Sequence, residues 1–286
     1  MRNLVWVCLV GLLLSGCVSS SGHQRSNVND TNNATFAFDQ EQVLIKTGNY
    51  TALIEFYKQQ LQQSDQRETR LKLAQAYLDF QDPESALFIL GPLVRSPSKQ
   101  DTEFYLQGLA LYRLNRINEA QQSLTVAQVN SPNNAQTINM LGIIFAQSSQ
   151  FKQARASFNR ARELMYDDIT VKNNLALIDM LEEDYQSAAD RLLPIYHNGQ
   201  ADDRVIANLA IIMAKSGSLN HLHAFYAQKY SDQEIQHLFI TLRNLNLSSA
   251  MKFEVPSDFS IVDQAEGLHF IPDEKNGSVV DSEVQR

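Results

Sequence analysis

The sequence is poor in the residues that enzymes use as catalytic and metal-binding groups. Its 286 residues include two cysteines, Cys8 and Cys17, and six scattered histidines. His221 and His223 are two residues apart, which would place them on different faces of a helix. The chain has no HExxH zinc motif, no glycine-rich phosphate loop and no GxSxG nucleophile motif. These absences exclude the usual sites of zinc proteases, nucleotide-binding proteins and serine hydrolases. They predict a protein that is not an enzyme and takes no metal, cofactor or small-molecule substrate.

Positive charge is also scarce, since the chain has 24 Lys and Arg against 32 Asp and Glu. Without a basic excess, binding to nucleic acid is disfavoured.

Residues 248–286 lose helical periodicity and contain eight acidic and three basic residues, so they carry −5 of the net charge of −8. We expect this segment to be an acidic, mostly disordered tail. The alternative is that its short apolar runs, 259–262 and 268–271, dock on the rest of the chain or on a partner.

The first residues of the chain have the pattern of an export signal. A positive start at Arg2, an apolar run over 4–14 and small residues before Cys17 indicate a signal peptide at 1–16, too short to span a bilayer as a stable helix. Residues 14–17, Leu-Ser-Gly-Cys, resemble a bacterial lipobox. The resemblance implies cleavage before Cys17 and lipidation of its thiol. The alternative is a plain signal peptide with a chance cysteine.

Cysteine usage agrees with a lipid anchor. Cys8 would leave with the signal peptide, so the mature chain keeps one cysteine and cannot form an internal disulfide. Residue 18 is valine rather than aspartate, which in enterobacterial-type lipoproteins implies export to the periplasmic face of the outer membrane. Residues 17–34 are polar and rich in Ser and Asn, so we expect a lipidated, flexible tether.

From residue 101 to 202, small and large apolar residues recur at an interval of 34 residues, the period of tetratricopeptide repeats. Gly108 with Ala120, and Gly142 with Ala154, provide small side chains where two antiparallel helices cross closely. Larger residues follow these alanines by one helical turn. The matching sets are Phe104, Gly108, Ala120, Leu124, Ala127 and Pro132, and then Ile138, Leu141, Gly142, Phe145, Ala154, Phe158 and Ala161.

With this many matching positions, the sequence resembles the tetratricopeptide family rather than a chance amphipathic bundle. The resemblance implies an all-α fold, a right-handed superhelical solenoid of helix hairpins over residues 35–247. The register extends over about six units, from 33–66 to 203–236, and a further helix over 232–247 would cover the apolar end. In the last unit Leu222 stands where a small residue is expected, so the two helices there must separate or cross differently.

The first helix of each unit is expected to line the concave side of the solenoid, where mixed apolar, Tyr, Met and Asn side chains suit an extended or helical peptide. The alternative is that half of these residues pack between helices. The Lys and Asn pattern that clamps a C-terminal carboxylate in some family members is not matched, because Leu71 and Tyr105 stand where lysine is needed. The predicted partner-binding residues are Tyr105, Leu109, Tyr112, Asn139, Met140, Ile143, Asn173, Asn174, Leu177, Met180, Asn208 and Ile211.

Three runs in the later units carry a narrower resemblance. They are Asn-Asn-Leu-Ala-Leu at 173–177, Leu-Leu-Pro-Ile at 192–195 and Asp-Arg-Val-Ile-Ala-Asn-Leu-Ala-Ile at 203–211. They resemble the TadD proteins, which are repeat lipoproteins of the Flp (tight adherence, Tad) pilus machinery. The resemblance implies an outer-membrane lipoprotein that helps to assemble or place the pilus secretin. Its protein partner would be the secretin or an accessory subunit.

Two alternatives to this assignment remain open, because the first two units and the acidic tail depart from the TadD pattern. One is another outer-membrane assembly lipoprotein, such as a type IV pilotin or a barrel-assembly subunit. The other is a regulator that uses its repeats to hold cell-wall hydrolases or proteases.

The lipobox leads to a direct prediction about attachment. Cys17→Ala should abolish lipidation and release the protein from the membrane, because the thiol that carries the acyl chains is lost. Metabolic labelling with a fatty acid, followed by membrane fractionation, measures both effects. Equal labelling of the wild type and the variant would contradict the assignment of Cys17.

Overall fold

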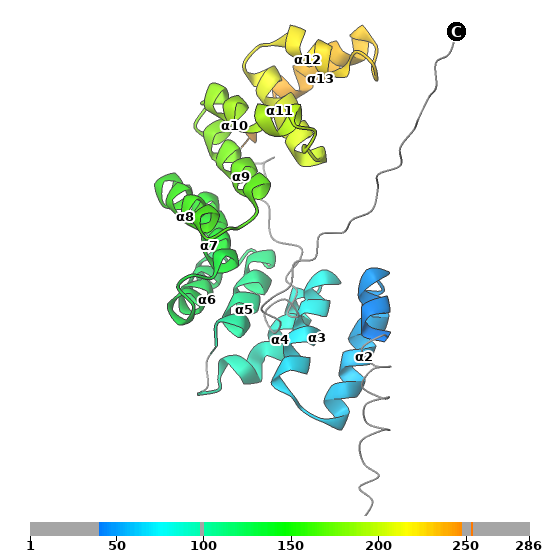
Figure 1. Ribbon diagram of the computed structural model, residues 1–286, viewed down its shortest axis with the longest axis vertical. Coiled ribbons are helices and arrows are strands. Elements are labelled where there is room, and N and C mark those ends of the chain that lie inside the picture. Colours follow the sequence, from blue (N-terminus) through cyan, green and yellow to red (C-terminus); the bar gives the residue numbers. More distant parts are fainter. Residues whose placement is uncertain (1–39, 98–99, 248–252, 254–286) are drawn as a thin grey trace, which may run out of the picture. The chain divides into compact units, whose positions relative to one another are not determined.

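The structure, a computed structural model, describes residues 40–97, 100–247 and 253 (Figure 1). The chain divides into two compact units, Met1–Gly48 and Asn49–Arg286. In the first unit the described part is a helix over residues 40–46, followed by a turn. The predicted signal peptide, the tether with Cys17, and the predicted tail except for Phe253 all lie outside the described residues.

In the described part of the second unit, every regular element is an α-helix. The helices are α2 (Tyr50–Gln63), α3 (Arg67–Asp79), α4 (Pro83–Val94), α5 (Asp101–Arg113), α6 (Ile117–Asn130), α7 (Ala135–Gln147), α8 (Phe151–Glu163), α9 (Asp168–Leu181), α10 (Tyr185–His197), α11 (Asp203–Lys215), α12 (Leu219–Tyr226) and α13 (Asp232–Arg243).

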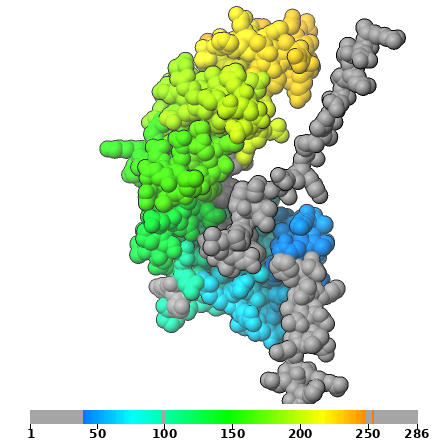
Figure 2. Space-filling view, in the orientation of Figure 1, coloured from blue at the N-terminus to red at the C-terminus, as the bar shows by residue number. Residues whose placement is uncertain are grey.

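Consecutive helices pair as hairpins, α3 with α4, α5 with α6, α7 with α8, α9 with α10 and α11 with α12. Each second helix also contacts the first helix of the next unit, and the hairpins abut in chain order from cyan to yellow in Figure 2. The fold is therefore the all-α tetratricopeptide-type solenoid that the 34-residue period predicts. The additional helix α13 packs on α11 and α12, and it ends at Arg243, earlier than the predicted end at residue 247.

The turn inside each hairpin repeats with the same 34-residue period. One residue in each turn has a positive φ, and the next residue donates its N–H to a carbonyl five positions earlier, as Gln150 does to Phe145 at 2.8 Å. This is the hydrogen bonding of a Schellman C-cap, which satisfies the last carbonyls of the first helix. The left-handed residues are Gln81, Asn115, Ser149, Glu183 and Gly217. The backbone therefore establishes the register independently of the apolar side chains.

The two helices of a unit cross closely at glycine. A Cβ atom on Gly108 would lie 2.6 Å from Cγ of Leu124, and a Cβ atom on Gly142 would lie 2.7 Å from ring carbons of Phe158. Leu124 and Phe158 are completely buried, and they belong to one apolar core that extends from α3 to α11. The predicted close crossing is confirmed, and it holds the largest residue of the second helix directly against the backbone of the first.

Helix starts are marked by short polar side chains that accept hydrogen bonds from backbone N–H groups two or three residues later. Asp202 is the N-cap of α11, since its carboxylate accepts hydrogen bonds from the backbone N–H groups of Arg204 and Val205 at 3.0 Å each. Ser231 and Glu234 form a capping box that starts α13. The same kind of cap is formed by Asn49, Asp82, Asn134, Asp167 and Asp184.

A buried carboxylate on the first helix α9 is bound by arginines from the two second helices beside it, α8 and α10. Asp179 on α9 is 2% exposed, and it accepts hydrogen bonds from Arg155 on α8 and from Arg191 on α10. Arg155 also pairs with Glu182 at the end of α9. Because the buried charge has two cationic donors, it is compensated, and it links three successive helices.

The glycine crossing predicts opposite effects for two mid-helix substitutions. Gly142→Ala should lower thermal stability, because the new Cβ meets the enclosed Phe158 ring, and overpacking of this kind costs about 1–3 kcal/mol. Gly91→Ala in α4 is the matched control. Its Cβ would meet the mobile end of the Arg95 side chain at 3.2 Å, so the gain in helix propensity, about 1 kcal/mol, should remain.

Thermal melts followed by circular dichroism measure both variants. A Gly142→Ala protein that melts at or above the temperature of the wild type would show that the helices do not cross closely at this residue.

Candidate protein-binding surface

The first helices of successive units form one continuous side of the array. Direct contacts join α3 to α5, α5 to α7, α7 to α9 and α9 to α11, whereas the described second helices α4, α6, α8 and α10 make no comparable contacts with one another. Figure 1 shows α6, α8 and α10 on the left of the array, with α5, α7 and α9 beside them. We call the side formed by α3, α5, α7, α9 and α11 the first-helix side.

All twelve predicted partner-binding residues lie on α5, α7, α9 and α11, the helices of this side. Three of them are half-buried, namely Tyr112, Asn208 and Ile211. The other nine, from Tyr105 to Met180, are at most 3% exposed. The structure therefore brings the set together on one side of the array, and a role in partner contact stays a prediction for each residue.

Polar side chains link neighbouring first helices. Arg67 donates to Glu103, whose side chain is 1% exposed, at 2.6 Å. The amide of Asn208 on α11 donates to Asn173 on α9 at 2.8 Å. A further bond runs from Arg113 to the carbonyl of Leu78. These bonds satisfy buried polar groups between units, as a buried polar group requires.

Asn139 on α7 is an exception to this pattern. Its side chain is completely buried, and neither its amide nitrogen nor its oxygen has a hydrogen-bond partner in the described part of the chain. Asn173, one unit later at the equivalent position, does have a partner in Asn208. A buried amide left without partners costs about 1–3 kcal/mol, so Asn139 is a polar group whose donor and acceptor are both left unsatisfied by the described residues.

Two tyrosines and an arginine of α5 have shifted pKa values. Burial raises the pKa of the Tyr105 and Tyr112 phenols, so both stay protonated at neutral pH. Burial lowers the pKa of Arg113, although the nearby Asp79 carboxylate opposes the shift. Neutral phenols and amides among apolar residues suit hydrogen bonding to a peptide backbone rather than acid–base chemistry.

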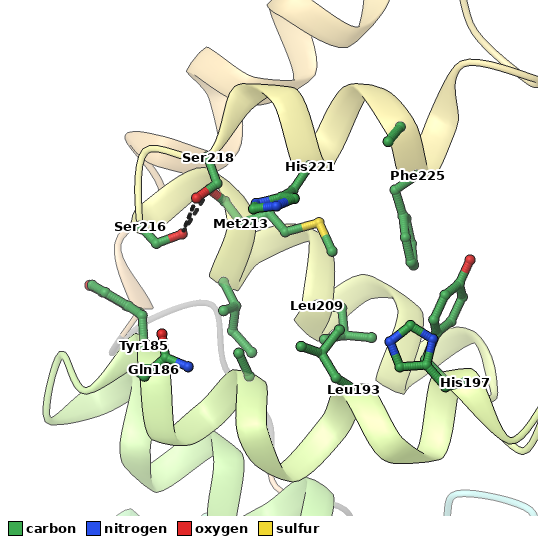
Figure 3. A pocket seen from close by; sticks show the side chains of 14 residues that line it. Tyr185, Gln186, Leu193, His197, Leu209, Met213, Ser216, Ser218, His221 and Phe225 are labelled. Carbon is green, nitrogen blue, oxygen red and sulfur yellow. Dashed lines mark hydrogen bonds between the residues drawn. The ribbon is translucent and has the colours of Figure 1, made fainter.

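A separate cavity of about 560 Å³ lies between α10, α11 and α12, and none of the twelve predicted residues lines it. Figure 3 shows Leu193, Leu209 and Met213 in its middle, with His197 and Phe225 at one end. The rings of Tyr196 and Phe225 meet there with centroids 4.6 Å apart. The cavity is thus an apolar and aromatic recess with histidines at its edge.

The sequence contained a signal for this recess in Leu222. Leu222 is completely buried, and α12 has only eight residues. A leucine at the position of the small residue keeps α12 from packing as closely as the second helices of earlier units, as the substitution predicts. The lining residues themselves could not be identified from the sequence, because they come from three helices of two units.

The described residues contain neither a metal-binding cluster nor a membrane-spanning helix. Within the described ranges, no three or more His, Cys, Asp or Glu side chains gather closely enough to hold a metal ion. Among the same residues, no helix combines the length and the apolar character needed to cross a bilayer.

The unpaired amide of Asn139 leads to a prediction about stability. Asn139→Leu should raise the free energy of unfolding by about 1 kcal/mol, because it replaces an unsatisfied buried amide with an apolar group of similar size. Asn173→Leu is the matched control. It should lower the free energy of unfolding by about 1 kcal/mol, since it leaves the amide of Asn208 without its acceptor. Denaturant unfolding measures both, and destabilisation by Asn139→Leu would contradict the unpaired state.

Comparison with known proteins supports the fold. No family model matches this chain, and no curated protein matches it. Among solved structures, one described as the functional characterization of Pseudomonas aeruginosa PilF is 16% identical, with a TM-score of 0.57, and the match covers 74% of this chain and 98% of that one. The APC/C hetero-tetramer Cut9–Hcn1 is 15% identical, with a TM-score of 0.58, over 70% of this chain and 40% of that one. MamA from Desulfovibrio magneticus RS-1 is 15% identical, with a TM-score of 0.50, over 59% of this chain and 97% of that one.

At these identities the similarities show the fold alone. Together with the 34-residue backbone period, they establish that this chain has a tetratricopeptide-type helical repeat fold.

Proposed function

We propose that this protein is an outer-membrane lipoprotein that uses the first-helix side of its repeats to hold a subunit of the Flp (Tad) pilus apparatus. The subunit is the pilus secretin or an accessory protein. The observation that carries the proposal is Asn139, a buried amide with a donor and an acceptor that no described residue uses. Both polar atoms of Asn139 are unpaired, whereas Asn173 at the equivalent position of the next unit pairs with Asn208, and this difference favours a ligand at Asn139.

A peptide group is the chemistry that fits Asn139. An asparagine amide offers N–H donors and a carbonyl acceptor, and a peptide backbone offers the matching acceptor and donor. The adjacent Met140 and Ile143, both completely buried, supply apolar surroundings in which such hydrogen bonds are stronger than in water. Burial of apolar side chains provides affinity, and the amide selects an extended or helical segment in one register.

The lipobox at residues 14–17 supports the proposed location. Lipids on Cys17 would fix the protein to the outer membrane, and the polar residues that follow would hold the repeats close to its periplasmic face. A secretin subunit that crosses the periplasm meets this surface before it inserts. Confinement near the membrane raises the effective concentration of the subunit without any additional contacts.

The assignment to the Tad pilus is supported by the runs at 173–177 and 203–211. These runs form parts of α9 and α11, and the Asn173–Asn208 hydrogen bond joins them. They therefore make up one continuous part of the first-helix side rather than separate surface segments. The similarity to the PilF structure adds support for the repeat architecture.

The proposal predicts a defect in pilus display. Deletion of the gene should leave pilin synthesised but absent from the cell surface, because the secretin is not assembled. Complementation with Asn139→Leu should reproduce part of the defect in a stable, lipidated protein, since the apolar side chain cannot pair with a peptide backbone. The control is Phe88→Ala, because Phe88 lies on α4 and is 81% exposed.

The measurements are surface pilin by immunoblotting of sheared cells and secretin multimers on non-boiled gels. Normal levels of both in the deletion strain would exclude the pilus function and favour the hydrolase-regulator alternative. A defect in the deletion strain together with full activity of Asn139→Leu would keep the pilus function and remove Asn139 from the binding surface.

A further inference from the structure

Phe253 belongs to the predicted acidic tail, yet it is part of the main apolar core. Its side chain is 5% exposed. The ring stacks with that of Phe158 on α8, with centroids 6.4 Å apart and ring planes inclined by 25°. A solvated tail would leave an aromatic ring exposed, so burial of Phe253 shows that the chain after α13 returns to the repeats.

The described residues on either side of 248–252 show the direction of this return. Nζ of Lys215 donates to the carbonyls of Arg243 and Leu245 at 2.8 and 2.6 Å, which holds the chain as it leaves α13. Leu247 then packs on the main core. Between Arg243 and Phe253 the chain passes from α13, which contacts α11 and α12, to α8 in an earlier unit. Ten residues span at most about 33–36 Å, which is sufficient to pass the intervening α9–α10 unit, because packed helices lie about 8–10 Å apart.

The position of Phe253 relates it to the proposed binding surface. Phe158, the ring that stacks with Phe253, is also the ring that lies against Gly142 of α7. Asn139 lies one helical turn before Gly142 on the same face of α7. The C-terminal chain is therefore anchored at the hairpin that carries the unpaired amide, and 33 residues follow the anchor.

We propose that residues 254–286 bind the first-helix side of their own array, with Phe253 as the anchor, and that a partner must displace them. This proposal rests on the proposed function of the first-helix side. Continuity of the chain favours this occupant, because residue 254 directly follows Phe253, which packs against α8 beside α7. A segment tethered at its binding site has an effective concentration in the millimolar range. Its apolar runs, 259–262 and 268–271, provide side chains that suit the mixed apolar and polar surface.

Occupation by the tail would regulate the affinity for a partner. If the segment covers the surface nine-tenths of the time, the apparent affinity of the partner falls about tenfold. Asn139 has no hydrogen bond from the described residues, so its amide is a group for which the tail and a partner would compete. The tail would thus exclude weak ligands, and a partner with the matching backbone would displace it.

Photo-crosslinking in the full-length protein tests the proposal. A benzophenone amino acid replaces Tyr112, which is half-buried on α5, and mass spectrometry identifies the crosslinked peptides. We expect crosslinks within one chain to peptides from residues 254–286. The same amino acid at Phe88, 81% exposed on α4, is the control and should give no such crosslink.

Two variants test the anchor and the segment separately. Phe253→Asp should reduce the crosslink from position 112 at least fivefold, because it removes the anchor. Phe259→Asp with Ile261→Asp should do the same and leaves Phe253 in the core, so this result holds even if Phe253→Asp unfolds. Absence of the crosslink in the wild type, crosslinks between chains only, or an unchanged yield in the second variant would overturn the proposal. The assay uses the purified protein alone, so its failure would leave the pilus display test unaffected.

Discussion

The close crossing of two helices at a glycine is the constraint on which the rest of the array depends. At Gly108 and Gly142 the absence of a Cβ lets Leu124 and Phe158 lie against the backbone of the first helix. The large residue of the second helix fills the space that the glycine of the first helix leaves, so the two must occur together. The large residue also follows the alanine of the second helix by one turn. Because each second helix also packs on the following first helix, an error at one crossing would be transmitted to the next unit.

This construction separates the two kinds of surface that the array presents. Contacts between second helices are absent in the described part of the chain, whereas first helices contact one another directly and exchange buried hydrogen bonds. Glu103 and Asn173 are paired in this way, whereas both polar atoms of Asn139 lack a partner among the described residues, at a cost in stability. Natural proteins keep such costs at functional sites, where the group interacts with a ligand rather than with the fold.

The last hairpin of the array packs differently from the hairpins in its middle. Leu222 prevents a close crossing in the last hairpin, which leaves the recess between α10, α11 and α12, and α13 covers the exposed face of α11. After α13 the chain contacts the repeats again. Lys215 of α11 binds the carbonyl of Arg243, and Leu247 and Phe253 pack on the main core. The terminal unit is thus the cap of the solenoid, and Phe253, ten residues after the end of α13, lies against Phe158 of an earlier unit.

The sequence by itself determined the helical class, the 34-residue period and the crossing at Gly108 and Gly142, because each depends on residues that are close along the chain or on a repeated spacing. It also located the twelve candidate residues on one set of helices. Only the tertiary structure decided how deeply those residues are buried, that Asn139 lacks the hydrogen bond that Asn173 makes, and that Phe253 lies against Phe158. Burial and hydrogen-bond pairing depend on helices from different units, and composition indicates only that an acidic segment is soluble, not whether one aromatic side chain within it finds a place in the core.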